Sequence, residues 1–337
     1  MTPPAARNAL TICTVSFHNA PHLALNWRLS DALNRDGASL RWVVAENSPL
    51  GAPDRLPTDD ARFDVIAGAS PDYYPNFQHA VALHGCFGRV ETRFALILDP
   101  DFYIVRPNWV STVIQYMDRQ ELGFLGVPWH PRLASKYRYF PAVHCFFIDT
   151  ERVALGDLDF RPLGKAERSR PGDELGPEGA EEEAPKPGLL GRALGLEARR
   201  KNYVDTGTRV YRRYAGTQEV RYECALPVFR LPQDSQVSHS WRLRLLERLL
   251  PDELCYLPKR RDSYTGRGLR ELGYLAGAPG RWEEFMWQGL PLGFHVRRNA
   301  EKARRDPEEE LRILRRAIDE FMPETAGVLE ETGESPT

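Results

Sequence analysis

The chain of 337 residues is long enough for one large domain or two smaller ones with a sizeable buried core. Its 45 Lys and Arg residues nearly balance its 47 Asp and Glu residues, so there is no basic excess to coat nucleic acid. The five cysteines are dispersed and form no CxxC pair, so we expect neither disulfides nor a structural zinc site. No apolar run is long enough to cross a membrane and no signal-peptide pattern is present, so we expect a cytoplasmic protein without a transmembrane segment.

Residues 9 to about 150 alternate between strand-like and helix-like patterns. Apolar and β-branched runs bounded by turn residues predict strands, and apolar residues recurring every three or four positions predict helices. The last predicted strand is almost entirely apolar, which is typical of a parallel strand buried on both faces. The alternation predicts an α/β fold with a doubly wound sheet. The predicted strands are 10–16, 41–45, 63–66 and 93–98, and the predicted helices are 23–33 and 76–87.

The rest of the chain changes composition from one segment to the next. Residues 151–201 contain a stretch, about 164–201, that is rich in Gly, Pro and charged residues and has no aromatic or β-branched residue. We expect a flexible, disordered insertion there. Its last part, 189–201, has the pattern of a short basic helix, for which we favour a solvated flap over a lid or a contact with a membrane surface. Residues 202–300 regain an ordered composition, and residues 301–337 are expected to form a C-terminal helical extension and a tail.

Two carboxylates follow the apolar strand that ends at Leu98. Asp99 and Asp101 are separated by one residue, so in an extended chain they project to the same side. Open α/β sheets bind ligands at the carboxyl ends of their strands, and neighbouring carboxylates repel one another unless a cation lies between them. Oxygen ligands suit Mg²⁺ or Mn²⁺, which commonly bridges a carboxylate to phosphate. The alternative is a surface turn, because Asp-Pro-Asp is also common in turns.

Four motifs of this region resemble, in their order, those of the GT-A glycosyltransferases, in particular the family 2-like enzymes that use sugar nucleotides. They are a first strand with its polar loop, an acid-Asn-Ser sequence after the second strand, a helix start and an Asp-x-Asp element, at residues 14–19, 43–48, 76–80 and 96–101. The resemblance implies a Rossmann-like, doubly wound mixed sheet. It also implies that residues 1–150 form the half that binds the nucleotide sugar.

The resemblance implies roles for individual residues as well. Asp101 would bind a Mn²⁺ or Mg²⁺ ion that holds the donor diphosphate, and Asp99 would contact the ribose or the donor sugar. The ion would neutralise charge that builds on the leaving diphosphate. The other implied contacts of the donor are Ser16, Asn19, Glu46 and Asn76.

Transfer with inversion also needs a carboxylate base that takes the proton of the acceptor hydroxyl. In the resembled family this base follows the acceptor-facing strand and opens a helix. Asp205 lies at such a place, before a predicted helix over 208–214, in what would be the acceptor and catalytic half. The alternative is structural, because Asp is a favoured N-cap residue.

The resembled enzymes often bring a late histidine to the metal or the diphosphate, and two candidates occur here. His295 is followed by Arg297 and Arg298, whose guanidinium groups suit diphosphate oxygens. Because neutral imidazole is a competent metal ligand and these neighbours suit the diphosphate, His295 is favoured over His239.

Aromatic and basic side chains are interleaved over 124–147, a pattern that suits sugar stacking and phosphate pairing, although some of these aromatics belong to a core. Taken together, these features predict a metal-dependent, inverting glycosyltransferase that moves a sugar from a nucleoside diphosphate sugar donor to a hydroxyl acceptor. By analogy the acceptor would be a glycan or lipid-linked glycan of a bacterial surface, and the enzyme would work in the cytoplasm with peripheral contact to the inner membrane. Two alternatives stay open: a nucleotidyltransferase, and a non-catalytic glycan-binding or scaffold protein.

Overall fold

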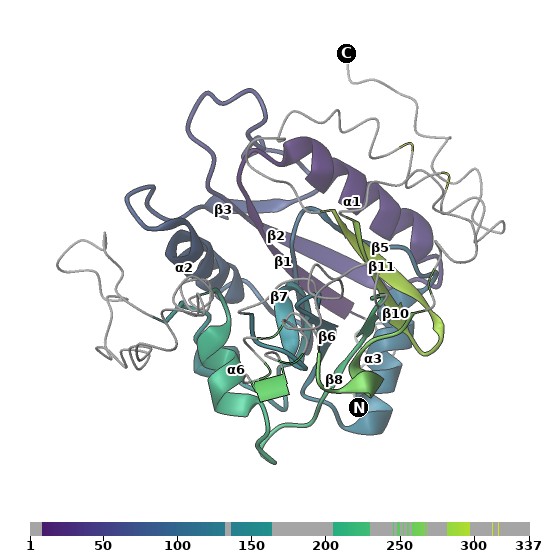
Figure 1. Cartoon of the computed structure of the whole chain (residues 1–337). Helices are drawn as coiled ribbons and strands as arrows, with labels where there is room; N and C mark the ends of the chain where they lie inside the picture. Colours follow the sequence, from purple (N-terminus) through teal and green to yellow (C-terminus); the bar gives the residue numbers. More distant parts are fainter. Residues whose placement is uncertain are drawn as a thin grey trace, which may run out of the picture.

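Two β-sheets organise the chain (Figure 1). The larger sheet has seven strands in the order β3-β2-β1-β4-β7-β6-β8, and the smaller has four in the order β5-β11-β10-β9. The computed structural model describes residues 9–131, 136–163, 205–229, 258–266 and 282–296, with single residues at 245, 248, 249, 252, 255, 268, 312 and 316.

The large sheet is mixed, because β1 is parallel to β2 and β4, and β2 to β3, whereas β7 is antiparallel to β4 and β6. Ser16 lies opposite Glu46 in the β1–β2 register, so the carboxyl ends of these two parallel strands meet at one edge. The loops that carry most of the predicted donor contacts therefore gather there. The strands are β1 (Ala9–Ser16), β2 (Ser39–Glu46), β3 (Asp64–Ala67), β4 (Phe94–Leu98), β6 (Phe124–Pro128), β7 (Pro141–Asp149) and β8 (Tyr222–Cys224).

Helices cover both faces of the large sheet. Buried residues of α1 (Ala20–Leu33) and α3 (Trp109–Gln120) share one hydrophobic cluster with Leu10 and Ile12 of β1. Buried residues of α2 (Pro75–Phe87) and α6 (Thr208–Tyr214) share a second cluster with the alternate β1 residues. Every helix in the described part of the chain is too short or too polar to cross a bilayer.

The small sheet is antiparallel and joins the chain's middle to its late residues. β5 (Phe102–Ile104) pairs with β11 (Leu290–Val296), which pairs with β10 (Trp282–Trp287), and β10 pairs with β9 (Leu226–Pro227). Phe102, Phe285 and Phe294 are fully buried and belong to the same cluster as α1 and α3. The small sheet is therefore fixed to the large one by shared core packing.

The observed elements confirm an α/β fold. The predicted strands and helices of the first 98 residues are all present, with ends shifted by a few residues, and α6 has the predicted bounds. Helix α3 and several later strands, among them β6, β10 and β11, are additional. The segment 164–204, and with it the predicted flexible insertion, lies outside the described residues, as does most of the predicted C-terminal helix.

The close contact between β5 and β11 depends on a glycine. A Cβ atom added at Gly293 would lie 2.5 Å from the carbonyl oxygen of Tyr103 and 2.8 Å from Cε1 of Phe102. We expect Gly293→Ala to lower the free energy of unfolding by about 1–3 kcal/mol, as overpacking does. Chemical denaturation measures this, with Gly156→Ala as control, because nothing lies within 4 Å of a Cβ at Gly156. Equal stability of the two variants would contradict the expectation.

Candidate metal centre

The Asp-Pro-Asp segment is the link by which the chain leaves the large sheet and enters the small one. β4 ends at Leu98 and β5 begins at Phe102, so Asp99 and Asp101 stand at the junction of the two sheets. The side chains of Asp99 and Asp101 are 25% and 23% exposed, whereas Pro100 between them is buried. The junction thus presents both carboxylates at a partly accessible surface while its backbone is held in the interior.

Hydrogen bonds to buried residues fix the backbone of this junction. Asn26 of α1 is 1% exposed, and its Nδ2 donates to the carbonyl oxygens of Pro100 at 3.3 Å and Phe102 at 2.8 Å. The backbone N–H of Asp99 donates to the carbonyl oxygen of His144 at 3.1 Å. The junction is therefore tied to α1 on one side and to β7 on the other.

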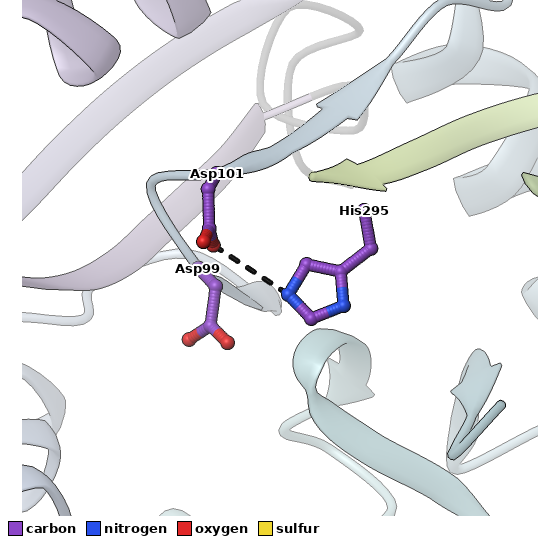
Figure 2. A group of neighbouring side chains, drawn as sticks. All are labelled: Asp99, Asp101 and His295. Carbon is purple, nitrogen blue, oxygen red and sulfur yellow. Dashed lines mark ion pairs between the residues drawn. The ribbon is translucent and has the colours of Figure 1, made fainter. Parts of the chain in front are cut away.

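Strand β11 delivers an imidazole to the same place. His295 lies opposite Phe102 in the β5–β11 register, and the N–H of Val296 donates to the carbonyl oxygen of Asp101 at 2.9 Å. Figure 2 shows the imidazole of His295 facing Asp101, with Nε2 3.6 Å from Oδ1 of that residue. One ligand atom from each of Asp99, Asp101 and His295 lies within 4.8 Å of the other two.

These three side chains fit a divalent cation by their chemistry. Two carboxylate oxygens suit Mg²⁺ or Mn²⁺, and an imidazole nitrogen adds a ligand that suits a transition metal such as Mn²⁺ better than Mg²⁺. Nδ1 of His295 lies 3.1 Å from Oε2 of the fully buried Glu283, which orients the ring. The metal-binding roles of Asp101 and His295 stay predictions.

The electrostatic environment of His295 favours its protonated form, so a metal ion would compete with a proton for Nε2. Burial alone would lower the pKa of the imidazole, but the carboxylates of Asp101 and Glu283 outweigh burial and raise the pKa of His295 to about 9. The ring is therefore protonated at neutral pH when no ion is bound. A metal ion and the Nε2 proton would occupy the same place.

A pH dependence follows for metal binding. Because His295 has to lose a proton to bind an ion, Mn²⁺ affinity should rise with pH, by up to about tenfold per pH unit below a pKa of about 9. Titration of Mn²⁺ by electron paramagnetic resonance between about pH 6.5 and 8.5 measures the slope. In His295→Asn the slope should become nearly flat, and an equal slope in both proteins would show that His295 is not the group that titrates.

His79 of α2 lies near both Asp205 and this carboxylate cluster. Its Nε2 is 3.8 Å from Oδ1 of Asp99, and its imidazole is within electrostatic reach of Asp205 and Asp101. Burial lowers the pKa of His79, and the two carboxylates only partly offset that. The imidazole of His79 is therefore neutral at pH 7 and close to Asp99.

The carboxylate of Asp205 is only 10% exposed and forms an ion pair with Lys136. The ammonium group of Lys136 also lies over the ring of Trp129, 4.5 Å from its centroid. The N-cap of α6 is Gly207, and no side chain caps this helix. Asp205 therefore does not cap α6 with its carboxylate, which instead accepts the N–H of Thr206 and pairs with Lys136.

The predicted donor contacts are arranged along the carboxyl edge of the parallel strands. Ser16 ends β1 and is fully buried, and Asn19 precedes α1. Glu46 ends β2, and its two carboxylate oxygens accept the N–H groups of Ser48 at 2.7 Å and Leu56 at 2.9 Å. Glu46 therefore organises the loop after β2, and a contact between Glu46 and the donor stays a prediction.

Asn76 lies in the first turn of α2, and its carbonyl oxygen accepts a hydrogen bond from Oγ1 of Thr206 at 3.1 Å. That bond joins the start of α2 to the residue after Asp205. His239, Arg297 and Arg298 lie outside the described residues.

Four residues of the site were not predicted from the sequence: Asn26, His79, Lys136 and Glu283. His79 stands three positions after Asn76 on the predicted helix 76–87, so helical spacing could have placed it on the same face. Lys136 lies in the aromatic and basic stretch 124–147, but its pairing with Asp205 was not predicted, and Asn26 and Glu283 reach the site through tertiary contacts and carry no local signal.

No family model matches the chain, and no curated protein sequence matches it. Among solved structures, it is similar to the mannosyltransferase PcManGT from Pyrobaculum calidifontis in complex with GDP-Man and Mn²⁺, with 13% identity and a TM-score of 0.31 over 43% of this chain and 45% of that one. It is also similar to S. aureus TarS 1-349 in complex with UDP-GlcNAc, with 10% identity and a TM-score of 0.32 over 45% and 48% of the two chains.

A third similar structure is the galactosyltransferase LgtC in complex with donor and acceptor sugar analogues, with 12% identity and a TM-score of 0.28 over 44% of this chain and 62% of that one. The chain thus spans about half the length of the first two proteins and less than two thirds of the third. Likeness at this level does not establish a shared activity, so function has to be inferred from the side chains of the site.

Proposed function

We propose that this protein is a metal-dependent glycosyltransferase of the GT-A type that transfers a sugar from a nucleoside diphosphate to a hydroxyl acceptor. The observation that carries the proposal is the convergence of Asp99, Asp101 and His295 at the junction where β4 leaves the parallel strands. Ligand sites of open α/β sheets lie at this edge. Two carboxylates and an imidazole suit a divalent ion that meets phosphate oxygens.

On the donor side, Asp101 and His295 would hold the ion, and Asp99 would lie next to the donor sugar or ribose. When bound, the ion supplies positive charge against the leaving diphosphate. Asn26 keeps the Asp-Pro-Asp junction in place through its two carbonyl contacts. The fixed junction means that little reorganisation is needed when donor binds, which favours catalysis.

On the acceptor side, Asp205 would accept the proton of the attacking hydroxyl, which is the role of a base in an inverting transfer. Its carboxylate is buried beside Lys136, so it is held in one place by an ion pair. Lys136 lies over the partly buried ring of Trp129, and the acceptor would approach Asp205 beside this pair.

Calorimetric titration with UDP, GDP, CDP and ADP, each with and without Mn²⁺, tests the proposal. We expect tight binding of one of these nucleotides that is lost when the ion is chelated, and slow hydrolysis of the matching sugar nucleotide. Release of pyrophosphate from a nucleoside triphosphate and a sugar phosphate would indicate a nucleotidyltransferase instead. A protein that binds glycan but shows no metal-dependent nucleotide binding would be a scaffold.

A further inference from the structure

A buried carboxylate stands directly behind the imidazole of the candidate metal centre. Glu283 of β10 is the register partner of His295 of β11, and its Oε2 lies 3.1 Å from Nδ1 of the ring. Glu283 is fully buried and His295 is 6% exposed. A buried carboxylate is stabilised by hydrogen bonds, and an imidazole Nδ1–H at this distance supplies one.

Aromatic packing fixes the plane of the same imidazole. The ring of His144 stacks on that of His295 with centroids 4.7 Å apart and an interplanar angle of 6°. Phe102 of β5, the strand that pairs with β11 on the side away from β10, has its ring centroid 6.1 Å from that of His295. The stack with His144 keeps the ring in one plane, and the contacts of Nδ1 with Glu283 and of Nε2 with Asp101 set the direction in which each nitrogen points.

We propose that Glu283 is a positioning residue that tunes the metal centre through His295 and makes it selective for Mn²⁺ over Mg²⁺. This inference rests on the proposed role of Asp99, Asp101 and His295 as a metal site. By accepting the Nδ1–H bond, Glu283 keeps that nitrogen protonated and directs the lone pair of Nε2 toward the two aspartates. A carboxylate behind the ring also makes Nε2 a stronger ligand.

Selectivity follows from the kind of ligand that Glu283 supports. Mg²⁺ is bound mostly by oxygen and keeps several of its waters, so it gains little from an imidazole. Mn²⁺ accepts both oxygen and imidazole nitrogen. A change that weakens Nε2 as a ligand should therefore reduce Mn²⁺ affinity and leave Mg²⁺ affinity nearly unchanged.

The next residue on the strand provides a matched control. Glu284 is 5% exposed, so it is almost as buried as Glu283, but successive strand residues point to opposite faces. Its carboxylate lies against Gly268, where an added Cβ would meet it, and away from His295. Replacing Glu283 or Glu284 by glutamine removes one buried charge from β10, but only Glu283 contacts the imidazole of His295.

The experiment compares Mn²⁺ and Mg²⁺ binding in the full chain and in E283Q, E283L and E284Q, with circular dichroism to verify folding. Mn²⁺ binding is followed by electron paramagnetic resonance, and Mg²⁺ binding by competition. We expect the Kd for Mn²⁺ to rise about tenfold in E283Q and up to about a hundredfold in E283L, as for lost partners of metal-bound histidines. The Kd for Mg²⁺ should change by less than about threefold in either variant, and E284Q should match the unsubstituted protein in both.

The outcomes separate the inference from the proposed function. If the unsubstituted protein binds neither ion, with or without nucleoside diphosphate, the proposed metal site is wrong. If it binds Mn²⁺ and E283Q and E283L bind Mn²⁺ equally well, the role of Glu283 is refuted. If the Kd values for Mn²⁺ and Mg²⁺ rise together, or if E284Q behaves like E283Q, Glu283 serves the fold and not selectivity.

A measurement on the unsubstituted protein keeps the inference testable if the Glu283 variants fail to fold. In protein labelled with ¹⁵N in its histidines, addition of diamagnetic Zn²⁺ should shift the resonance of Nε2 of His295, while Nδ1 keeps its proton. A metal-induced shift at Nδ1 would overturn the inference, because that nitrogen would then be the ligand and Glu283 could not be its acceptor.

Discussion

Replacing Asp101 by asparagine is expected to remove the metal-dependent part of nucleoside diphosphate binding and to leave the fold intact. The amide keeps the shape of the side chain and loses the charge that faces Nε2 of His295 at 3.6 Å. Because an ion at a leaving group contributes several kcal/mol, we expect turnover to fall by at least about a hundredfold. Titration of nucleotide with and without Mn²⁺ gives the binding result, and product formation gives the rate.

Asp118→Asn is a suitable control for this experiment. Asp118 of α3 is 58% exposed and forms an ion pair with Arg93, in a different part of the molecule. The Asp118→Asn variant should bind nucleotide and Mn²⁺ as the unsubstituted protein does. If Asp101→Asn still shows the full difference between titrations with and without Mn²⁺, Asp101 does not belong to a metal site.

Replacing Asp205 by asparagine is expected to reduce kcat by about 10²–10⁴-fold while donor binding stays unchanged, as for loss of a general base. The amide cannot take a proton, yet it can still accept the N–H of Thr206, which lies 2.9 Å from Oδ1 in the native side chain. Single-turnover kinetics with saturating donor separates the chemical step from donor binding. The donor Kd is measured in parallel by titration.

Asp159→Asn tests whether any change near α6 has the same effect. Asp159 forms ion pairs with Arg161 and with Arg209 of α6, so it contacts the same helix through a different charged group. Its kcat should stay within about threefold of normal, since ion pairs of partly exposed groups contribute little. If Asp205→Asn lowers only the melting temperature and keeps its specific activity, the Asp205–Lys136 pair is structural.

Elements with strong local signals were predictable from the sequence. The apolar strand β4 and the helix α6 needed no tertiary information, because period and turn residues define them. Helix α3 carried an equally clear signal, with Val110, Val113 and Ile114 spaced as on one helical face, but it was not among the predicted elements. Strand β10 was missed because two consecutive acids interrupt its apolar residues, and it is stabilised as a strand by pairing with β11.

The part of the candidate site that has a local signal in the sequence was also predictable. Asp99 and Asp101 could be found because the carboxylates directly follow a buried strand. The partnership of Glu283 with His295 could not, since it depends on which residues of β10 and β11 face one another. The two-residue turn at Gln288 and Gly289 sets the register of this hairpin, and the bulge between Phe285 and Met286 then shifts it by one residue, which the turn alone does not reveal.

The pairing of β5 with β11 has a consequence for biosynthesis. Among the described strands, β5 pairs with β11 alone, and contacts near it, such as that between Arg106 and Trp287, join residues 181 positions apart. At about 5–20 residues per second, the edge formed by Phe102, Tyr103 and Ile104 would wait roughly ten to forty seconds for its partner on the ribosome. An unpaired apolar edge is a site of aggregation during that interval. Production of the folded protein should therefore depend on chaperones that shield nascent chains, more than its native surface would indicate.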